Sequence, residues 1–337
     1  ALYGKEADKI FVFPPSGIDS GNPFFAEINN QIPGRRYVGI IPSGTTSDAT
    51  IAIRLFGALL FAAKTLNVQK EEEKDPYWTN VGYYNSLREL GQAMTWINAD
   101  IREHLNTMFS RKRKESLNSG LDERYIFSYE ELTSRIPNDK IPYALQRLNT
   151  RYPSEDSLEK PIDICLATNM ISVGLDISRL GLMTVVGQPK TTSEYIQATS
   201  RIGRSVSSPG LVFVLYRPSR PRDKSHYEHF QHYHSRFYSN VEPTSITPFS
   251  APLREKALHA IVFGLIRQNR NNLGNENPPK HPTNAEKAKC LDIISARVSV
   301  SAPEEKDDTL HKVSSIFAKW ESKNHQRYVD WDCQDTL

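Results

Sequence analysis

Three apolar runs in the middle of the chain restrict its fold more than any other feature. They are IDICLA at residues 162–167, LMTVVG at 182–187 and LVFVLY at 211–216. Their apolar residues follow one another without regular alternation, which is typical of strands that are buried on both faces. Because stretches with helical spacing lie between strands of this kind, we expect a parallel sheet that is covered by helices on both sides.

The rest of the chain extends this α/β pattern. Before the three runs, we predict short strands at 37–43 and 80–86, and helices at 47–66, from 87 to about 105, and at about 142–149. After Pro218 the pattern becomes helical, with predicted helices at 226–238, at about 253–267 and at about 285–320, the last of them broken near 302–308.

These elements suggest a division into parts. The expected parts are a leading segment at 1–34, a sheet domain at 35–218 and a mostly helical extension at 219–337, with a linker near 269–284. The overall class is therefore α/β with a mainly helical carboxy-terminal extension.

Composition leaves the kind of partner open. The net charge is only +3, but residues 201–236 gather arginines, either as a phosphate-binding patch or as an ordinary solvated surface. Cys165, Cys290 and Cys333 are far apart and form no C-x-x-C pair, so we expect reduced thiols. The sequence has no apolar run of about 18 residues and no signal peptide, so we expect a cytoplasmic protein that does not cross a membrane.

Two segments that follow predicted strands carry the chemistry. They read LATNMISVGLDI at 166–177 and YIQATSRIGRS at 195–205. Gln197, Arg201 and Arg204 are separated by four and three residues, so a continuous helix would present all three side chains on one face. The planar guanidinium group of arginine can donate two parallel hydrogen bonds to phosphate oxygens. Three polar side chains on one face would therefore contact the same ligand.

These segments resemble motifs V and VI of superfamily 2 helicases. Motif VI usually reads Q-x-x-G-R-x-G-R, and the chain departs from it at Ser200. GYYNS at 82–86 resembles the weaker motif IV. The resemblance implies a RecA-like fold. It also implies that Arg204 is the arginine finger and that Arg201 and Gln197 have catalytic roles. The implied ATP contacts are Gly174 and Asp176, and the implied nucleic-acid contacts are Thr168, Asn85 and Ser86.

The same resemblance indicates that half of an active site is missing. GIIPSGTT at 39–46 has the glycine spacing of a phosphate-binding loop, but Thr45 stands where lysine is needed, so we interpret it as a strand-to-helix turn. DERY at 122–125 imitates an acidic magnesium motif, but no buried strand precedes it. We therefore expect ATP and Mg²⁺ to be shared with a first RecA-like domain absent from this chain, which alone should not hydrolyse ATP.

The segment after the last apolar run resembles the helicase component of DISARM-type antiphage systems. This resemblance implies a DNA translocase, with DNA favoured over RNA, and a defence-complex partner. Arg217, Arg220 and Arg222 stand beside aromatic residues, a mixture that binds single strands. Alternatively, Phe230 and Phe237 are core residues.

The sequence also bears on metal binding and on catalysis as such. Four histidines lie between 226 and 234 without a convergent cysteine or carboxylate pattern, so we predict no metal site. The alternative function is a non-catalytic nucleic-acid or protein interaction module that retains the RecA-like fold.

Overall fold

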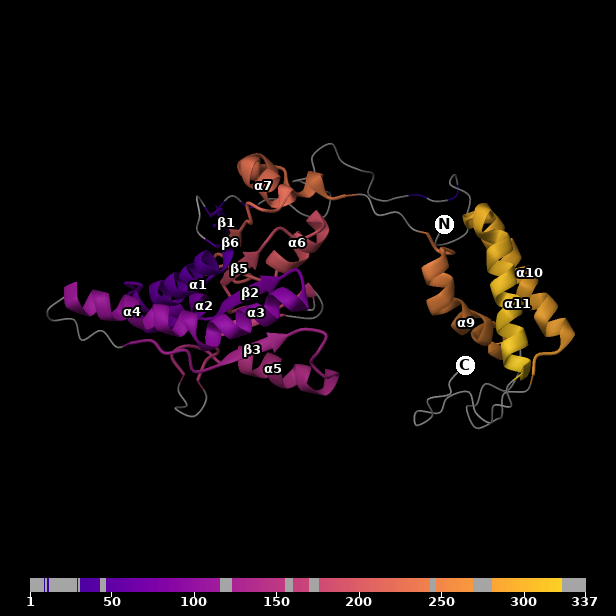
Figure 1. The fold of residues 1–337 in the computed structure, drawn as a ribbon, viewed down its shortest axis with the longest axis horizontal. Coiled ribbons are helices and arrows are strands. Elements are labelled where there is room, and N and C mark those ends of the chain that lie inside the picture. Colours follow the sequence, from indigo (N-terminus) through magenta and orange to yellow (C-terminus); the bar gives the residue numbers. More distant parts are fainter. Residues whose placement is uncertain are drawn as a thin grey trace. The chain divides into compact units, whose positions relative to one another are not determined.

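The computed structural model describes residues 31–42, 47–115, 123–154, 160–169, 176–242, 247–268 and 281–322, together with Lys9, Phe11 and Asn29. The chain separates into two compact units, with the division between Glu242 and Pro243 (Figure 1). The first unit contains the sheet. The second contains the last long helices. The segment between Pro218 and Glu242 lies with the sheet.

In the described part of the chain, six parallel strands form one sheet in the order β1-β6-β5-β2-β4-β3. The strands are β1 (Arg36–Ile40), β2 (Asn80–Tyr84), β3 (Tyr129–Leu132), β4 (Ile164–Ala167), β5 (Leu182–Val186) and β6 (Leu211–Leu215). Val81 in β2 lies opposite Cys165 of β4 and Met183 of β5. The predicted parallel sheet is confirmed. Strand β3 was not predicted, because its sequence YEEL has two acidic residues and it lies at the sheet edge.

Among the described residues, helices lie in the connections after β1, β2, β3 and β5, as crossovers between parallel strands usually require, and two more helices of the same unit follow β6. They are α1 (Asp48–Thr65), α2 (Asp75–Trp78), α3 (Leu87–Asn98), α4 (Asp100–Glu115), α5 (Ile141–Leu148), α6 (Thr192–Thr199), α7 (Pro221–Glu228) and α8 (Phe230–Ser235). Short 3₁₀ turns lie at η2 (Glu71–Lys74), η3 (Asn138–Lys140) and η5 (Phe237–Asn240).

Each face of the sheet has its own core. On one face, residues such as Tyr83 and Val185 pack with Leu148 of α5 and Tyr195 of α6. On the other face, Tyr84, Leu166 and Val186 pack with residues of α1, α3 and α4. Neighbouring residues of one strand point to opposite faces, and every residue of the central strands β2, β4 and β5 is buried. This explains why the strand sequences are apolar without alternation.

The second unit is helical, as expected. Its elements are α9 (Ala251–Gln268), α10 (Asn284–Ser301), η6 (Pro303–Glu305) and α11 (Lys306–Ser322). Val262, Cys290, Phe317 and Trp320 form part of its separate core. Thr283 and Glu286 form a reciprocal capping box at the start of α10. Among the described helices, none is long and apolar enough to span a membrane.

Candidate nucleic-acid interface

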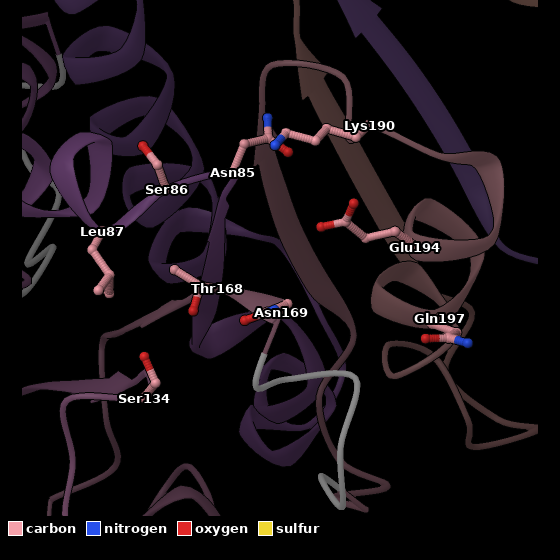
Figure 2. A pocket seen from close by; sticks show the side chains of 9 residues that line it. All are labelled: Asn85, Ser86, Leu87, Ser134, Thr168, Asn169, Lys190, Glu194 and Gln197. Atoms are coloured by element: carbon pink, nitrogen blue, oxygen red, sulfur yellow. The ribbon is translucent and has the colours of Figure 1, made fainter. Parts of the chain in front are cut away.

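A pocket of about 530 Å³ opens at the carboxyl ends of the strands (Figure 2). The segments that follow four successive strands, β2 to β5, contribute to it, because the carboxyl ends of parallel strands meet at one edge of the sheet. The residues that line it are Asn85, Ser86, Leu87, Ser134, Thr168, Asn169, Lys190, Glu194 and Gln197. Asn85, Ser86 and Thr168, the three predicted nucleic-acid contacts that precede motif VI, therefore lie together.

Hydrogen bonds hold the rim of this pocket in place. The Nδ2 atom of Asn85 donates to the carbonyl oxygens of Val186, Gly187 and Gln188 at 3.3, 3.0 and 3.4 Å, which ties the end of β2 to the loop after β5. The Ser86 hydroxyl accepts from the Glu89 amide at 3.3 Å and caps α3. Helix α3 therefore begins at the pocket, with unpaired amides and the positive end of its dipole at this edge.

The three arginines that follow β6 form a separate group. Arg217 and Arg220 both contact the Glu89 carboxylate, with 2.9 Å between Arg217 Nη1 and Glu89 Oε1. Arg222 donates to the carbonyl oxygen of Gln188 at 3.0 Å. A Cβ at Gly187, which has a φ of +78°, would lie 3.2 Å from the Asn85 amide and 3.3 Å from Arg220 Nη1. This group thus adjoins the Asn85 side of the pocket, but Glu89 balances part of its charge.

Two of the aromatic residues beside these arginines belong to the packing of the core. Phe230 and Phe237 both pack against the core that contains Tyr195 and Tyr233. His234 accepts from or donates to the Tyr195 hydroxyl at 3.1 Å and stacks on Phe237. The structure therefore supports the packing alternative for Phe230 and Phe237, in place of base stacking.

The arginines of motif VI do not share a helical face with Gln197. Helix α6 ends at Thr199, and Arg201 and Arg204 lie in the turns beyond it, so the prediction of one continuous helix was wrong. Gly203 has a φ of +64°, and its amide donates to the Leu180 carbonyl oxygen at 2.7 Å. The backbone reverses here. Gln197 lines the pocket, whereas the Arg204 guanidinium contacts the exposed Asp176 carboxylate.

Gly203→Ala is expected to lower the free energy of unfolding by roughly 2–4 kcal/mol, because positive-φ strain and a backbone clash add together. Its Cβ would lie 2.1 Å from the Gly210 nitrogen. Gly91→Ala in α3 is the matched control, since a Cβ there meets nothing within 4 Å, and should stabilise the protein by about 0.5–1 kcal/mol. Urea unfolding measures both changes. Equal effects of the two alanines would contradict this view of the turn.

Several predicted residues lie outside the described part of the chain. Gly174 is one of them, and so are Thr45 and Asp122 of the two segments that were interpreted as imitations. Arg124, in the second imitation, has a structural role: it is buried and pairs with Asp163 at 2.9 Å.

Five residues of the pocket were not predicted from the sequence: Leu87, Ser134, Asn169, Lys190 and Glu194. Lys190 and Asn169 closely follow predicted strands, so the rule that strand carboxyl ends meet could have found them. Ser134 follows the strand that was not predicted. Glu194 lies on α6, where only Gln197 and the arginines of motif VI were predicted to be functional.

Comparison with known proteins agrees with the fold of this domain. Residues 93–206 match the helicase conserved C-terminal domain family, and the six-stranded parallel sheet has the predicted RecA-like architecture. Over 315 residues the chain is 40% identical to the DISARM protein DrmA of Bacillus paralicheniformis, which confirms the predicted resemblance. The match covers 92% of this chain and 27% of DrmA, so the chain spans about a quarter of the length of this relative.

Solved helicase structures are similar at lower levels. The DUF1998 helicase MrfA, in a structure with DNA and AMPPNP, is 16% identical with a TM-score of 0.45, covering 71% of this chain and 27% of MrfA. The Mycobacterium smegmatis helicase Lhr, bound to single-stranded DNA and AMP-PNP, is 12% identical with a TM-score of 0.44, covering 80% of this chain and 27% of Lhr.

Proposed function

We propose that this chain supplies the second RecA-like half of an ATP-dependent nucleic-acid helicase or translocase, and that the pocket at the carboxyl ends of the strands binds the strand. The pocket is the observation that carries this proposal. It combines the Lys190 ammonium, the Thr168 hydroxyl and the amino-terminal end of α3, which are all groups that bind phosphate. DNA is the proposed polymer, as the resemblance to the helicase component of DISARM-type systems implies.

The proposed ATP site lies on a different part of the domain. Arg204 would act on the γ-phosphate as the arginine finger, with Arg201 assisting it and Asp176, its contact, at the same site. Gln197, the third predicted catalytic residue, lines the strand pocket instead, and Gly174, the other predicted ATP contact, lies outside the described residues. ATP and Mg²⁺ would be held by the first RecA-like domain of a longer protein, since phosphoryl transfer needs a lysine and magnesium ligands from a phosphate-binding loop. A further subunit of a defence complex is the proposed partner of that longer protein.

Lys190→Ala is expected to weaken binding of a fluorescent 15-nucleotide DNA by about three- to tenfold and to reduce the salt dependence by about one ion, because one phosphate contact is lost. The measurement is fluorescence anisotropy of this chain at low and physiological salt, with DNA and the equivalent RNA. Lys70→Ala is the matched control. Lys70 is also exposed, but it precedes η2 and β2 and does not line the pocket. Equal losses in both variants would contradict the assignment of the pocket.

A further inference from the structure

Glu194 is an unexpected residue in a pocket that is proposed to bind phosphate, because its carboxylate has the same charge as phosphate. It is the one carboxylate among the nine described residues that line the pocket. It is the third residue of α6, and its side chain extends from the helix into the pocket (Figure 2). Lys190 lies four residues earlier, but among the described residues neither side chain has an ion pair. Glu194 is therefore not simply a counter-ion for the pocket lysine.

Tyr83 fixes the position of this carboxylate. The Tyr83 hydroxyl donates a hydrogen bond to Glu194 Oε1 at 2.6 Å. Tyr83 lies on β2 and is completely buried. Burial, followed by the hydrogen bond to Glu194, raises the pKa of Tyr83, so the phenol stays protonated near neutral pH and can donate this bond. Thr191 also caps α6 by accepting from the Glu194 amide at 3.2 Å. One oxygen, Oε2, remains to accept from a ligand.

A fixed carboxylate selects which part of a nucleotide can lie against it. A phosphate is repelled by like charge, so it will lie on the side of Lys190 and Thr168. The uncharged donors of a nucleotide are attracted, and a carboxylate pairs well with the exocyclic amino group of a base, as Glu and Asp do with the N4 amino group of cytosine. Lys190 and Glu194 thus divide the pocket into a phosphate side and a base side.

We propose that Glu194 is a specificity-determining residue, which accepts a hydrogen bond from the exocyclic amino group of one nucleobase and gives the pocket a preference for cytosine and adenine over thymine. This inference rests on the proposed function, since it requires a strand in the pocket. It goes beyond that function because it assigns base selectivity to a site whose other groups recognise only the backbone.

Glu194→Gln provides a sharp test, because it inverts the chemistry without changing the shape. Tyr83 will still donate to the carbonyl oxygen of the glutamine, so the amide nitrogen replaces Oε2 and presents a donor to the base. The measurement is binding of the chain to 15-nucleotide dC, dA, dT and abasic strands. The wild type should bind dC and dA about three- to tenfold more tightly than dT. The variant should reverse this preference and bind the abasic strand more tightly, since it no longer repels phosphate.

Three further variants test whether the preference depends on the carboxylate at this position. Glu72→Gln removes the same charge from an exposed position in η2, away from the pocket, and should leave base preference unchanged. Tyr83→Phe removes the hydroxyl that fixes Glu194 and should weaken the preference without reversing it. Lys190→Ala should weaken binding to every strand and keep the preference. Thermal unfolding of each variant confirms that it folds.

The possible results distinguish the inference from the proposed function. A wild type that binds dC and dT equally, with no change in Glu194→Gln, overturns the role of Glu194 and leaves strand binding intact. A preference for rU over dU strands that is lost in Glu194→Gln also overturns it, because the donor would then be the ribose 2′-hydroxyl. Failure of the wild type to bind any strand, including the abasic one, overturns the proposed function and this inference together.

Discussion

Arg204→Ala is expected to abolish ATP turnover in a protein that joins this chain to a first RecA-like domain with a phosphate-binding loop. An arginine that reaches the transferring phosphoryl group contributes about 10³–10⁵ in kcat, so the loss should be at least about a thousandfold. The fold should not change. The Arg204 side chain is 32% exposed, and its contacts are the exposed Asp176 carboxylate and the Ser200 carbonyl oxygen at 3.2 Å.

The matched variants decide whether charge or geometry matters. Arg204→Lys keeps the charge but not the planar fork, and should also lose most of the activity. Arg113→Ala, at an exposed position of α4 that pairs with Glu123, should leave kcat unchanged. A steady-state hydrolysis assay with saturating nucleic acid gives the comparison. An unaltered kcat in Arg204→Ala would remove the arginine-finger assignment and favour the non-catalytic interaction module.

Asp163→Ala is expected to lower the free energy of unfolding of the sheet unit by about 3–5 kcal/mol, because it leaves a buried guanidinium without a counter-charge. Asp163 is 2% exposed and accepts from Arg124 and from the amides of Phe127 and Ser128. Burial lowers the pKa of Arg124, and the Asp163 carboxylate opposes that shift. Arg124 also lies over the Trp78 ring, 3.8 Å from its centroid.

Urea unfolding followed by circular dichroism and tryptophan fluorescence measures this loss. Asp139→Ala is the control, since Asp139 is exposed in η3, and should change stability by less than about 0.5 kcal/mol. Strand binding by folded Asp163→Ala should remain, because Asp163 precedes β4 and the pocket lies beyond the other end of that strand. Unfolding midpoints that agree within error for the two variants would show that the ion pair contributes little.

The local pattern of the sequence was enough to find most of the sheet. Buried strands such as β4, β5 and β6 are continuous apolar runs, and helices such as α1 begin at a capping residue, here Ser47. Strand β3 escaped prediction because an edge strand needs fewer apolar residues than a central one. The end of α6 was not predicted for a different reason. Gly203 turns the backbone beyond this helix, where its amide donates to the Leu180 carbonyl oxygen and its Cα lies against Gly210, and a local sequence pattern shows neither contact.

The sequence by itself determined the α/β class, because apolar runs and helical spacing are local patterns. The resemblance to motifs V and VI predicted roles for Thr168, Gln197, Arg201 and Arg204. Only the tertiary structure decided how these residues are grouped. Parallel strand order places Asn85, Thr168 and Lys190 at one edge, and the turn at Gly203 directs Arg204 to Asp176 instead of toward Gln197. The tertiary structure also brings together Tyr83 and Glu194, which are 111 positions apart in the chain. Side-chain convergence across a sheet depends on strand order, and strand order is set by long-range packing that no local pattern contains.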